Sequence, residues 1–404
     1  MAQVLPIIIT HPLRNKVCIF PTEDDCELSP SDINSIIRRN PYSFNNIFYK
    51  PYIKRLEGVK KYKAIRRQFQ KFKRNRIIQT DENPGFYIYC ITDNERNEFC
   101  GIVGQIPHSE FENGNIHKIE KSLPSAVLEK TQLVSHIRFI SKPITVIHKD
   151  LEDIDTIIEK YKSKIPLYEF TRTNGYSHEV WQVLDPDDIN TIKESYKHSE
   201  QFYIIDDNNN FDALHNIYKE NLEKGKRIFS GQEAFNFFPA FLISQNQVKI
   251  HEYKKGLPVD YPKTTEEILE VLKKHFYFIQ IDDYDLPQKG EILLYALDGK
   301  YQLTPKDHID SHLPDSFIFE KYILPEITEN QSLINYNEFK FCDGKRSAKC
   351  VENQLNKGNC KFGFIIRPMD FDEIEKAIKQ NIKVPYKSLY LEPRLLKGLF
   401  IYEI

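Results

Sequence analysis

The sequence lacks most features that place a chain in a common class at first sight. It has one Trp and two Met among 404 residues, but 27 Phe and 23 Tyr, so we expect a core of aromatic rings rather than adaptable methionines. The 56 Lys and Arg residues nearly balance the 58 Asp and Glu residues, which argues against nucleic-acid binding over the whole surface. With 40% hydrophobic and 28% charged residues, the composition is that of a folded globular chain.

Two further absences concern the membrane and the redox compartment. No apolar run approaches the roughly 20 residues that span a bilayer, and the N-terminus lacks a basic leader, so we expect neither a membrane span nor a signal peptide. The seven cysteines form no Cys-x-x-Cys pair, which argues against a zinc ribbon or a thioredoxin-type site. We therefore expect reduced thiols in a cytoplasmic protein. The cysteines are Cys18, Cys26, Cys90, Cys100, Cys342, Cys350 and Cys360.

Common catalytic motifs are also missing. The sequence contains no Gly-x-x-x-x-Gly-Lys-Ser/Thr loop, no Gly-x-Gly-x-x-Gly fingerprint, no protein-kinase signature, no Gly-x-Ser-x-Gly and no His-Glu-x-x-His. Any nucleotide or metal chemistry must therefore use a less common site.

What is present is an irregular alternation of strand and helix patterns without repeats or low-complexity linkers. Asp185 caps one expected helix, and capping boxes begin two others, at Thr264 and at Asp370. This mixture predicts an α+β fold with mixed sheets and flanking helices. The expected strands are Ile7–Thr10, Phe86–Ile91, Phe99–Gln105, Pro143–His148, Tyr203–Ile205, Ala240–Ser244, Val248–Tyr253, Glu291–Ala296 and Gly363–Arg367, and further helices are expected from Ser31 or Asp32 to Arg39 and over Leu151–Tyr161.

The segment from Lys50 to Arg76 is the most basic part of the chain. It contains twelve Lys or Arg residues and one acid, so it could form a face that binds phosphate or nucleic acid. Four apolar residues recur in it at helical spacing: Tyr62, Ile65, Phe69 and Phe72. We favour an amphipathic helix whose apolar side packs while its lysines stay in water.

Three segments carry side chains suited to phosphate chemistry. Asp206 ends a buried strand before a helix start, where a carboxylate can hold Mg²⁺ and backbone N–H groups can bind phosphate, although such residues also simply cap helices. Glu120 can act as a general base or be an ordinary solvated acid. Near the C-terminus, cationic and hydroxyl side chains can gather around an anion or lie on a closing strand. They are Lys387, Ser388, Arg394 and Lys397.

Several segments, in order along nearly the whole chain, resemble one family. They are Asn40-Pro41-Tyr42-Ser43-Phe44, Gly101-Ile102-Val103-Gly104, Glu120-Lys121-Ser122-Leu123-Pro124, His178-Glu179-Val180-Trp181, Tyr203-Ile204-Ile205-Asp206 and Pro385-x-Lys387-Ser388-x-Tyr390-x-Glu392-Pro393-Arg394. The family was long catalogued as a domain of unknown function, includes pyrophosphate-dependent free-serine kinases, and is related to ParB-like serine kinases. The sequence departs from it where Asp207-Asn208-Asn209-Asn210 stands in place of Gly-His-His-Arg.

The resemblance implies a ParB/sulfiredoxin-like catalytic core in one unit over 1–404, with tentative sub-domains 1–80, 81–235 and 236–404. It implies a Mg²⁺-dependent phosphotransferase that makes O-phospho-L-serine from L-serine and pyrophosphate. In this reading Glu120 is the catalytic base, and Asp206 is catalytic and holds Mg²⁺. The phosphates would be bound by the backbone N–H groups at Asn208, Asn209 and Asn210 together with Lys387, Ser388 and Arg394, and the substrate by His117, His178 and Trp181.

A kinase of this type requires Glu120 and Asp206 to line one cleft, because a base must come within roughly 2.6–3.2 Å of the serine hydroxyl. The altered Asp207–Asn210 segment motivates an alternative, a catalytically degenerate paralogue that binds a metabolite or a protein. Nucleic-acid binding through the basic segment is a weaker third possibility. The sequence leaves open the choice between pyrophosphate and a nucleotide, and the oligomeric state.

Overall fold

The protein is described by a computed structural model that covers residues 2–24, 28, 30–199, 201–224, 231–257, 259–282, 286–327, 340–342, 349–386 and 388–404. The chain forms two compact units. The first unit contains Met1–Lys118, Ser122–Val248 and Pro393–Ile404, and the second contains Ile119–Lys121 and Lys249–Glu392. The sub-domains expected at 1–80, 81–235 and 236–404 stay a prediction. Among the described residues, no helix is both long and apolar enough to cross a bilayer.

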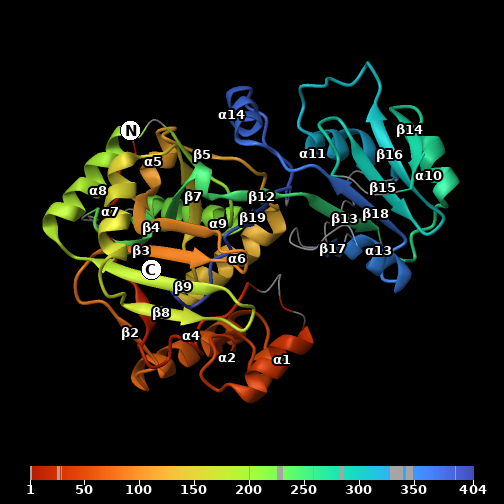
Figure 1. The fold of residues 1–404 in the computed structure, drawn as a ribbon. Helices are drawn as coiled ribbons and strands as arrows, with labels where there is room; N and C mark the ends of the chain where they lie inside the picture. Colours follow the sequence, from red (N-terminus) through yellow and green to blue (C-terminus); the bar gives the residue numbers. More distant parts are fainter. Residues whose placement is uncertain are drawn as a thin grey trace. The chain divides into compact units, whose positions relative to one another are not determined.

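The first unit is organised by a mixed sheet, in which the described residues supply eight strands in the order β5-β10-β7-β11-β4-β3-β9-β8 (Figure 1). Four of the expected strands, those beginning near Phe86, Phe99, Ile144 and Ala240, lie side by side in this sheet. The strand near Tyr203 lies on one side of these four, and the strand near His178 lies on the other side. The bounds are β3 Phe86–Thr92, β4 Glu98–Pro107, β5 Ile116–Lys118, β7 Ile144–His148, β8 Tyr168–Thr171, β9 Ser177–Val183, β10 Phe202–Ile204 and β11 Phe237–Ser244.

The middle of this sheet is buried on both faces. Every residue of β11 is buried, and so is β4 from Phe99 to Gly104. Gly101 is required there because a Cβ atom at this position would lie 2.5 Å from the carbonyl oxygen of Leu242 and 2.7 Å from the ring of Phe241. Gly101 therefore permits the close approach of β4 to β11.

Helices of the first unit begin and end largely where the sequence indicates. The side chain of Asp185 accepts hydrogen bonds from the backbone N–H groups of Asp187 and Asp188, which confirms the predicted cap of α8. The bounds are α5 His108–Glu112, α6 Pro124–Ile137, α7 Glu152–Lys162, α8 Pro186–His198 and α9 Asn208–Glu223, with 3₁₀ turns at Ala234–Asn236 and Gln245–Gln247.

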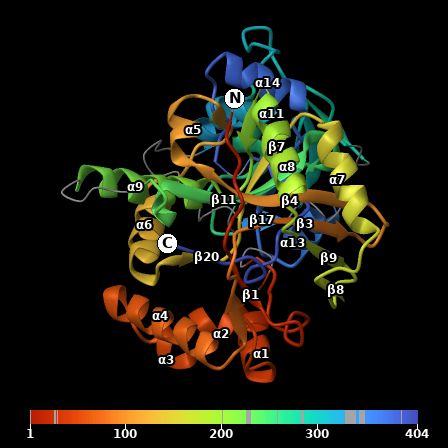
Figure 2. The same ribbon diagram turned by 90° about the vertical axis from the view of Figure 1, so that its left-hand side faces the viewer.

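The N-terminal residues form a helical layer of the first unit (Figure 2). Its helices are α1 Pro30–Arg39, α2 Asn45–Phe48, α3 Pro51–Lys54 and α4 Gly58–Arg74. Ile65, Phe69 and Phe72 of α4 are buried in a shared core and Tyr62 packs against it, whereas the basic residues of the helix are mostly exposed. The amphipathic interpretation of the basic segment is thereby confirmed.

Short strands tie the chain termini to this layer. β1 spans Thr10–Pro12 and pairs with β2 Ile78–Thr80, while β6 Phe139–Ile140 pairs with β20 Tyr402–Glu403. The strand expected over Ile7–Thr10 is therefore placed too early: Ile7 makes only an isolated bridge to Gly85, and the regular pairing starts at Thr10.

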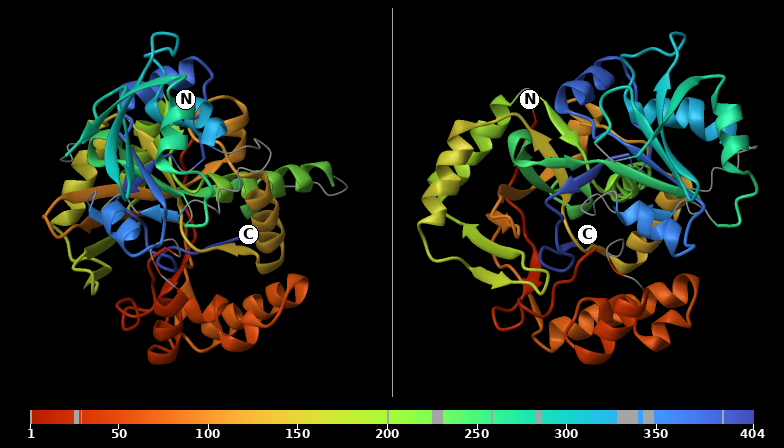
Figure 3. Two further views of the ribbon diagram at one scale, coloured as in Figure 1. Left: turned by 90° about the vertical axis from the view of Figure 1, so that its right-hand side faces the viewer. Right: turned by 45° about the vertical axis from the view of Figure 1, so that its right-hand side comes forward.

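The second unit has its own sheet, with six strands among the described residues in the order β14-β16-β15-β18-β13-β17 (Figure 3). Both predicted capping boxes are present, at the starts of α10 and α14. The bounds are β12 Lys249–His251, β13 Tyr253–Leu257, β14 Phe276–Ile281, β15 Ile292–Ala296, β16 Gly299–Pro305, β17 Lys340–Cys342, β18 Phe362–Ile366, β19 Tyr390–Glu392, α10 Thr265–Leu272, α11 Asp315–Ile318, α12 Leu324–Ile327, α13 Lys349–Asn356 and α14 Phe371–Lys379, with a π-helical turn at Phe319–Ile323.

Strand alternation divides the core of the second unit between two faces. Leu294 and Phe364 face the apolar residues of α10 and of the helical segment from Asp315 to Ile327. Leu293 and Ile365 face Val351 and Leu355 of α13 on the other side. The unit thus has helices on both faces of one sheet, and the whole chain is a mixed α/β protein with several sheets.

The expectation of reduced thiols is wrong for one pair. Cys90 on β3 and Cys100 on β4 are directly opposite in the antiparallel register, with Cα atoms 4.2 Å apart, and their sulfurs form a disulfide. Ten positions separate them in sequence, and only the strand pairing brings them together. Of the other described cysteines, Cys18 is exposed, and Cys350 and Cys360 are buried.

Candidate functional site

Asp206 and Asp207 lie at the junction of β10 and α9 in the first unit. β10 is buried throughout and ends at Ile204, where its parallel neighbour β5 ends at the paired residue Lys118. Asp207 then adopts the left-handed conformation, with φ of 59°, and precedes the first residue of α9. This conformation favours glycine, which stands here in the family that the sequence resembles. Asp is among the few other residues that tolerate it.

The junction is organised around a buried lysine. Lys142 lies between β6 and β7 and its side chain is 3% exposed. Its Nζ atom is 2.8 Å from Oδ2 of Asp207, 2.7 Å from Oδ2 of Asp24 and 3.8 Å from Oδ2 of Asp206. One buried cation thus holds three carboxylates that come from two distant parts of the sequence.

Two cations of the C-terminal segment complete this charge cluster. Nζ of Lys397 is 3.3 Å from Oδ1 of Asp24, and Nη1 of Arg394 is 3.7 Å from Oδ2 of Asp206. Reciprocal backbone hydrogen bonds of 3.0 and 2.8 Å between Thr22 and Lys397 fix the segment that carries Asp24 against the C-terminal segment. We call Asp24, Lys142, Asp206, Asp207, Arg394 and Lys397 the Lys142 cluster.

The charges of the cluster shift its pKa values in opposite directions. Burial opposes ionisation of Asp24, but Lys142 and Lys397 outweigh it and hold the pKa of Asp24 well below its ordinary value. Burial raises the pKa of Asp207, and Lys142 offsets only part of this effect. Burial also lowers the pKa of Lys142, but the carboxylates of Asp207 and Asp24 more than compensate, so this pKa is raised well above its ordinary value.

The three asparagines at the start of α9 have different surroundings. Oδ1 of Asn209 accepts a hydrogen bond of 3.1 Å from the backbone N–H of Leu123, and Nδ2 of Asn210 donates one of 2.9 Å to Oδ1 of Asp207. Asn208 is buried, and its Oδ1 has no hydrogen-bond partner among the described residues. The backbone N–H of Asn210 donates to the carbonyl of Asp207. Their role in phosphate binding stays a prediction.

The residues expected to bind substrate do not gather at one place. His178 and Trp181 are three positions apart on the regular strand β9, so their side chains point to opposite faces of the sheet. Burial lowers the pKa of His178 to about 3, and its Nδ1 lies 2.8 Å from the hydroxyl of Tyr89. Nε1 of Trp181 donates to the carbonyl of Lys164. His117 is half-buried on β5, and burial lowers its pKa.

Glu120 belongs to the second unit. Its side chain is buried rather than solvated, and its Oε1 accepts backbone hydrogen bonds of 2.9 Å from Ser388 and 2.7 Å from Leu389. Donors of this kind stabilise the ionised carboxylate. The expectation that Glu120 and Asp206 share one cleft stays a prediction, because Asp206 belongs to the first unit. Lys387 lies outside the described residues.

A buried lysine of the second unit interacts electrostatically with Glu120. Lys255 on β13 is 4% exposed. Burial lowers its pKa to about 8, although the negative charges of Glu320 and Glu120 act in the opposite direction. A lysine with this pKa exchanges its proton near neutral pH, which is unusual for a side chain of its type.

Sequence reasoning missed Lys142 and Lys255, and it assigned no role to Asp24. Lys142 stands alone between Ser141 and Pro143 in front of a buried strand, and no motif distinguishes it from a surface lysine. Its three carboxylate partners become apparent only when the β6–β7 connection meets both the β10–α9 junction and the N-terminal segment that carries Asp24.

The donor set of the cluster fits Mg²⁺ in one respect. Mg²⁺ is commonly held by one or two carboxylates together with substrate phosphates and water. Asp206 has a partly exposed carboxylate whose nearest cations are 3.7 and 3.8 Å away, so it is the carboxylate of the cluster best placed to serve as such a ligand. Of the three cations, Lys142 is engaged with the carboxylates of Asp24 and Asp207, whereas Arg394 and Lys397 are side chains of the kind that binds anions.

Comparison with known families places this chain. A family described as "Protein of unknown function (DUF1015)" matches residues 19–327, and the chain belongs to this family. No curated protein matches the sequence.

Solved structures show weak similarity. SbnI with a C-terminal truncation from Staphylococcus aureus is 12% identical, with a TM-score of 0.40 over 73% of this chain and 85% of that one. A conserved hypothetical protein from Pyrococcus furiosus is 10% identical, with a TM-score of 0.39 over 72% and 92%. A free serine kinase in complex with AMP is 10% identical, with a TM-score of 0.38 over 69% and 84%.

Proposed function

We propose that this protein is a phosphotransferase that moves a phosphoryl group from pyrophosphate to the hydroxyl of free L-serine, with Mg²⁺. The observation that carries the proposal is the Lys142 cluster, in which Lys142, Arg394 and Lys397 lie among three carboxylates at a helix start. Phosphoryl transfer depends mainly on positioning and on compensation of negative charge, which such a cluster supplies. We assign this chemistry to a ParB/sulfiredoxin-like core.

Four side chains act on the substrates or the metal in this proposal. Glu120 removes the proton of the serine hydroxyl as its oxygen attacks one phosphorus of pyrophosphate, the bridging P–O bond breaks and orthophosphate leaves. The two backbone N–H donors from Ser388 and Leu389 orient the Glu120 carboxylate. Asp206 would hold Mg²⁺, which, when bound, neutralises charge on the phosphates. Arg394 and Lys397 bind the non-bridging oxygens of the donor.

Lys142 positions the carboxylates of the cluster instead of contacting substrate. Because it is nearly fully buried, it compensates the charges of Asp24 and Asp207 and leaves Asp206, the more exposed carboxylate, oriented for metal binding. The side chains of Asn209 and Asn210 are engaged with Leu123 and Asp207, so the proposal does not use these amide groups as phosphate ligands.

The test is formation of phosphoserine by purified protein. L-serine and MgCl₂ are combined with pyrophosphate, ATP or ADP in separate reactions, and O-phosphoserine is measured by mass spectrometry. We expect product with pyrophosphate. Product with a nucleotide but not with pyrophosphate would show that the protein is a kinase with a different phosphoryl donor. Absence of product with every donor would reject the proposal.

The engaged asparagines favour one other function, a catalytically degenerate protein that binds a small metabolite. Amide side chains that carry no charge and are already hydrogen-bonded to Leu123 and Asp207 add little to the stabilisation of a phosphoryl group. Isothermal titration calorimetry with L-serine and pyrophosphate distinguishes the two functions, because a binding protein gives saturable heat without any phosphoserine.

A further inference from the structure

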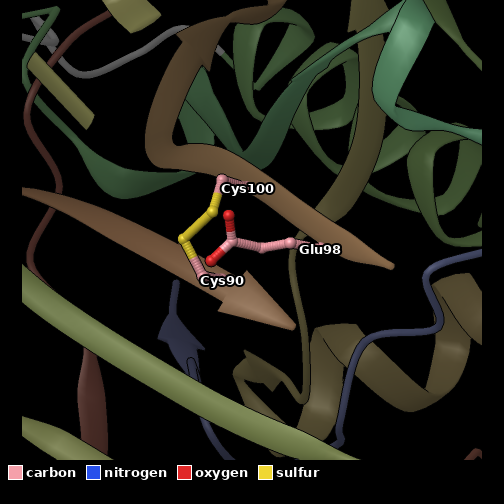
Figure 4. Close-up of side chains that lie close together, drawn as sticks. All are labelled: Cys90, Glu98 and Cys100. Carbon is pink, nitrogen blue, oxygen red and sulfur yellow. A yellow bond between two sulfur atoms is a disulfide. The ribbon is translucent and has the colours of Figure 1, made fainter. Parts of the chain in front are cut away.

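A second cluster of reactive side chains lies on the sheet of the first unit, at the β3–β4 hairpin. Cys90 and Cys100 are paired across the two strands, and Glu98 precedes Cys100 by two positions on the same face of β4. Figure 4 shows the carboxylate of Glu98 directed toward the two sulfurs. Tyr89 and His178 point to the opposite face of the sheet, so this cluster is separate from them.

The three side chains have the chemistry and the spacing of a metal-ligand set. One ligand atom from each of Cys90, Glu98 and Cys100 lies within 4.8 Å of the other two. Ligand atoms about 2.0–2.3 Å from one tetrahedral ion are roughly 3.3–3.8 Å apart. The two sulfurs must therefore move apart once the disulfide is reduced, and the carboxylate must move closer to them. Both cysteines are buried, whereas Glu98 is exposed, which gives an ion access from solvent at the carboxylate.

Neighbouring carboxylates give this face of the sheet a negative electrostatic potential. Glu179 on β9 is the register partner of Cys90, and Glu169 on β8 is the register partner of Glu179. Lys162 counters part of this charge by holding Oε2 of Glu98 at 2.7 Å, and the carboxylate has a second oxygen. Cation binding on this face would therefore relieve repulsion.

We propose that reduction of the Cys90–Cys100 disulfide converts the hairpin into a binding site for a thiophilic divalent cation such as Zn²⁺, with both thiolates and the Glu98 carboxylate as ligands. Two electrons and two protons from a dithiol reductant break the sulfur–sulfur bond and give two thiols, while the reductant becomes a disulfide. Binding of the cation releases the two thiol protons. Two thiolates and one carboxylate form a set suited to zinc, with the fourth position left to water.

The disulfide and the metal site exclude each other, so the cation is bound only in the reduced protein. The two cysteines are already opposite in the strand register, and neither state requires a change in the pairing of β3 with β4. The site does not depend on the proposed kinase function, because none of its ligands belongs to the Lys142 cluster.

The experiment uses the full-length chain with Co²⁺ and Zn²⁺. Protein is reduced with dithiothreitol, desalted without oxygen and titrated with Co²⁺, and the thiolate-to-cobalt absorption band is followed. We expect one Co²⁺ per reduced chain, displaced by Zn²⁺, and none in the oxidised chain. Glu98→Gln should weaken binding at least about tenfold, in line with the sensitivity of metal sites to lost partners. Cys18→Ser, which removes an exposed thiol elsewhere, serves as the matched control and should bind as wild type.

A measurement on wild-type protein avoids dependence on variant folding. Reduced protein is alkylated with iodoacetamide with and without Zn²⁺, and modified cysteines are mapped by mass spectrometry. We expect Zn²⁺ to protect Cys90 and Cys100 but not Cys18. Equal alkylation with and without Zn²⁺, or an unchanged cobalt band in the Cys90→Ser, Cys100→Ser double variant, would overturn the metal site. Wild-type affinity in Glu98→Gln would overturn the carboxylate as a ligand.

Discussion

At the scale of single residues, Lys142 determines how the candidate site is held together. A lysine this deeply buried is tolerated only because Asp24 and Asp207 lie within 2.7 and 2.8 Å of its ammonium group. The carboxylates also depend on the lysine, because burial raises the pKa of Asp207 even with the lysine present. The lysine and the carboxylates thus stabilise one another, and removal of Lys142 leaves the negative charges of buried carboxylates without this neighbouring positive charge.

Lys142→Met should therefore destabilise the protein in a pH-dependent way. We expect a loss of about 3–5 kcal/mol in the free energy of unfolding at pH 7, as found when one partner of a buried pair is removed. In wild type, the depressed pKa of Asp24 contributes stability above its unfolded value that is lost as pH falls through the folded pKa. Without the lysine, folded carboxyl pKa values rise above the unfolded ones, so low pH favours the variant.

The measurement is urea unfolding of both proteins at pH 7 and pH 4, where the deficit of Lys142→Met should be smaller at pH 4. Lys197→Met is the matched control, because Lys197 forms an exposed pair with Glu194 and its loss should change stability by less than about 0.5 kcal/mol. A deficit that is equal at both pH values would show that the carboxylates are not what the lysine compensates.

A second residue-scale prediction concerns Glu120→Gln. The amide oxygen of glutamine can still accept the N–H groups of Ser388 and Leu389, so stability should change by no more than about 1 kcal/mol. A neutral amide cannot accept the serine proton, so turnover should fall roughly 10²–10⁴-fold. Phosphoserine formation and urea unfolding measure the two effects separately. Exposed Glu194→Gln should leave both unchanged, and a Glu120→Gln enzyme with wild-type turnover would remove Glu120 as the base.

At the scale of elements, the sequence predicts structure well wherever one pattern repeats. The helical spacing of Ile65, Phe69 and Phe72 and the caps of α8, α10 and α14 are local signals, and they are confirmed. The Lys142 cluster and the Cys90–Cys100 disulfide are different, because each depends on which segments meet in the fold. Asp24, Lys142 and Arg394 have no common sequence pattern, and the disulfide depends on a strand register that composition does not encode.

The apolar face of α4 provides a prediction at this scale. Phe69 stacks on Phe139 with ring centroids 4.2 Å apart, so its side chain joins the helix to β6. Phe69→Ala should cost about 3–5 kcal/mol in the free energy of unfolding, through lost burial and a residual cavity. Lys63→Ala, on the exposed side of the same helix, should cost less than about 0.5 kcal/mol. Similar values for the two variants would contradict the packing interpretation of the basic segment.

At the scale of the whole molecule, the second unit is inserted into the sequence of the first. Residues 249–392 form nearly all of it, and the remaining segment is Ile119–Lys121. Its first and last strands, β12 and β19, pair so that Lys249 is opposite Glu392. The chain therefore enters and leaves the second unit at positions only about 5 Å apart. Such an insertion can be removed without stretching the chain that remains.

Replacement of residues 249–392 by a short glycine linker tests the independence of the first unit. All eight strands described for its main sheet lie outside that range, so we expect cooperative urea unfolding and retention of the helix signal in proportion to chain length. Turnover should fall roughly 10²–10⁴-fold, because Glu120 loses the amide donors from Ser388 and Leu389 that orient it as a base. The control carries the same linker inserted between Val248 and Lys249 of the intact chain, and it should keep both properties. A deletion variant that aggregates or unfolds without cooperativity, beside a folded control, would show that the first unit needs the second in order to fold.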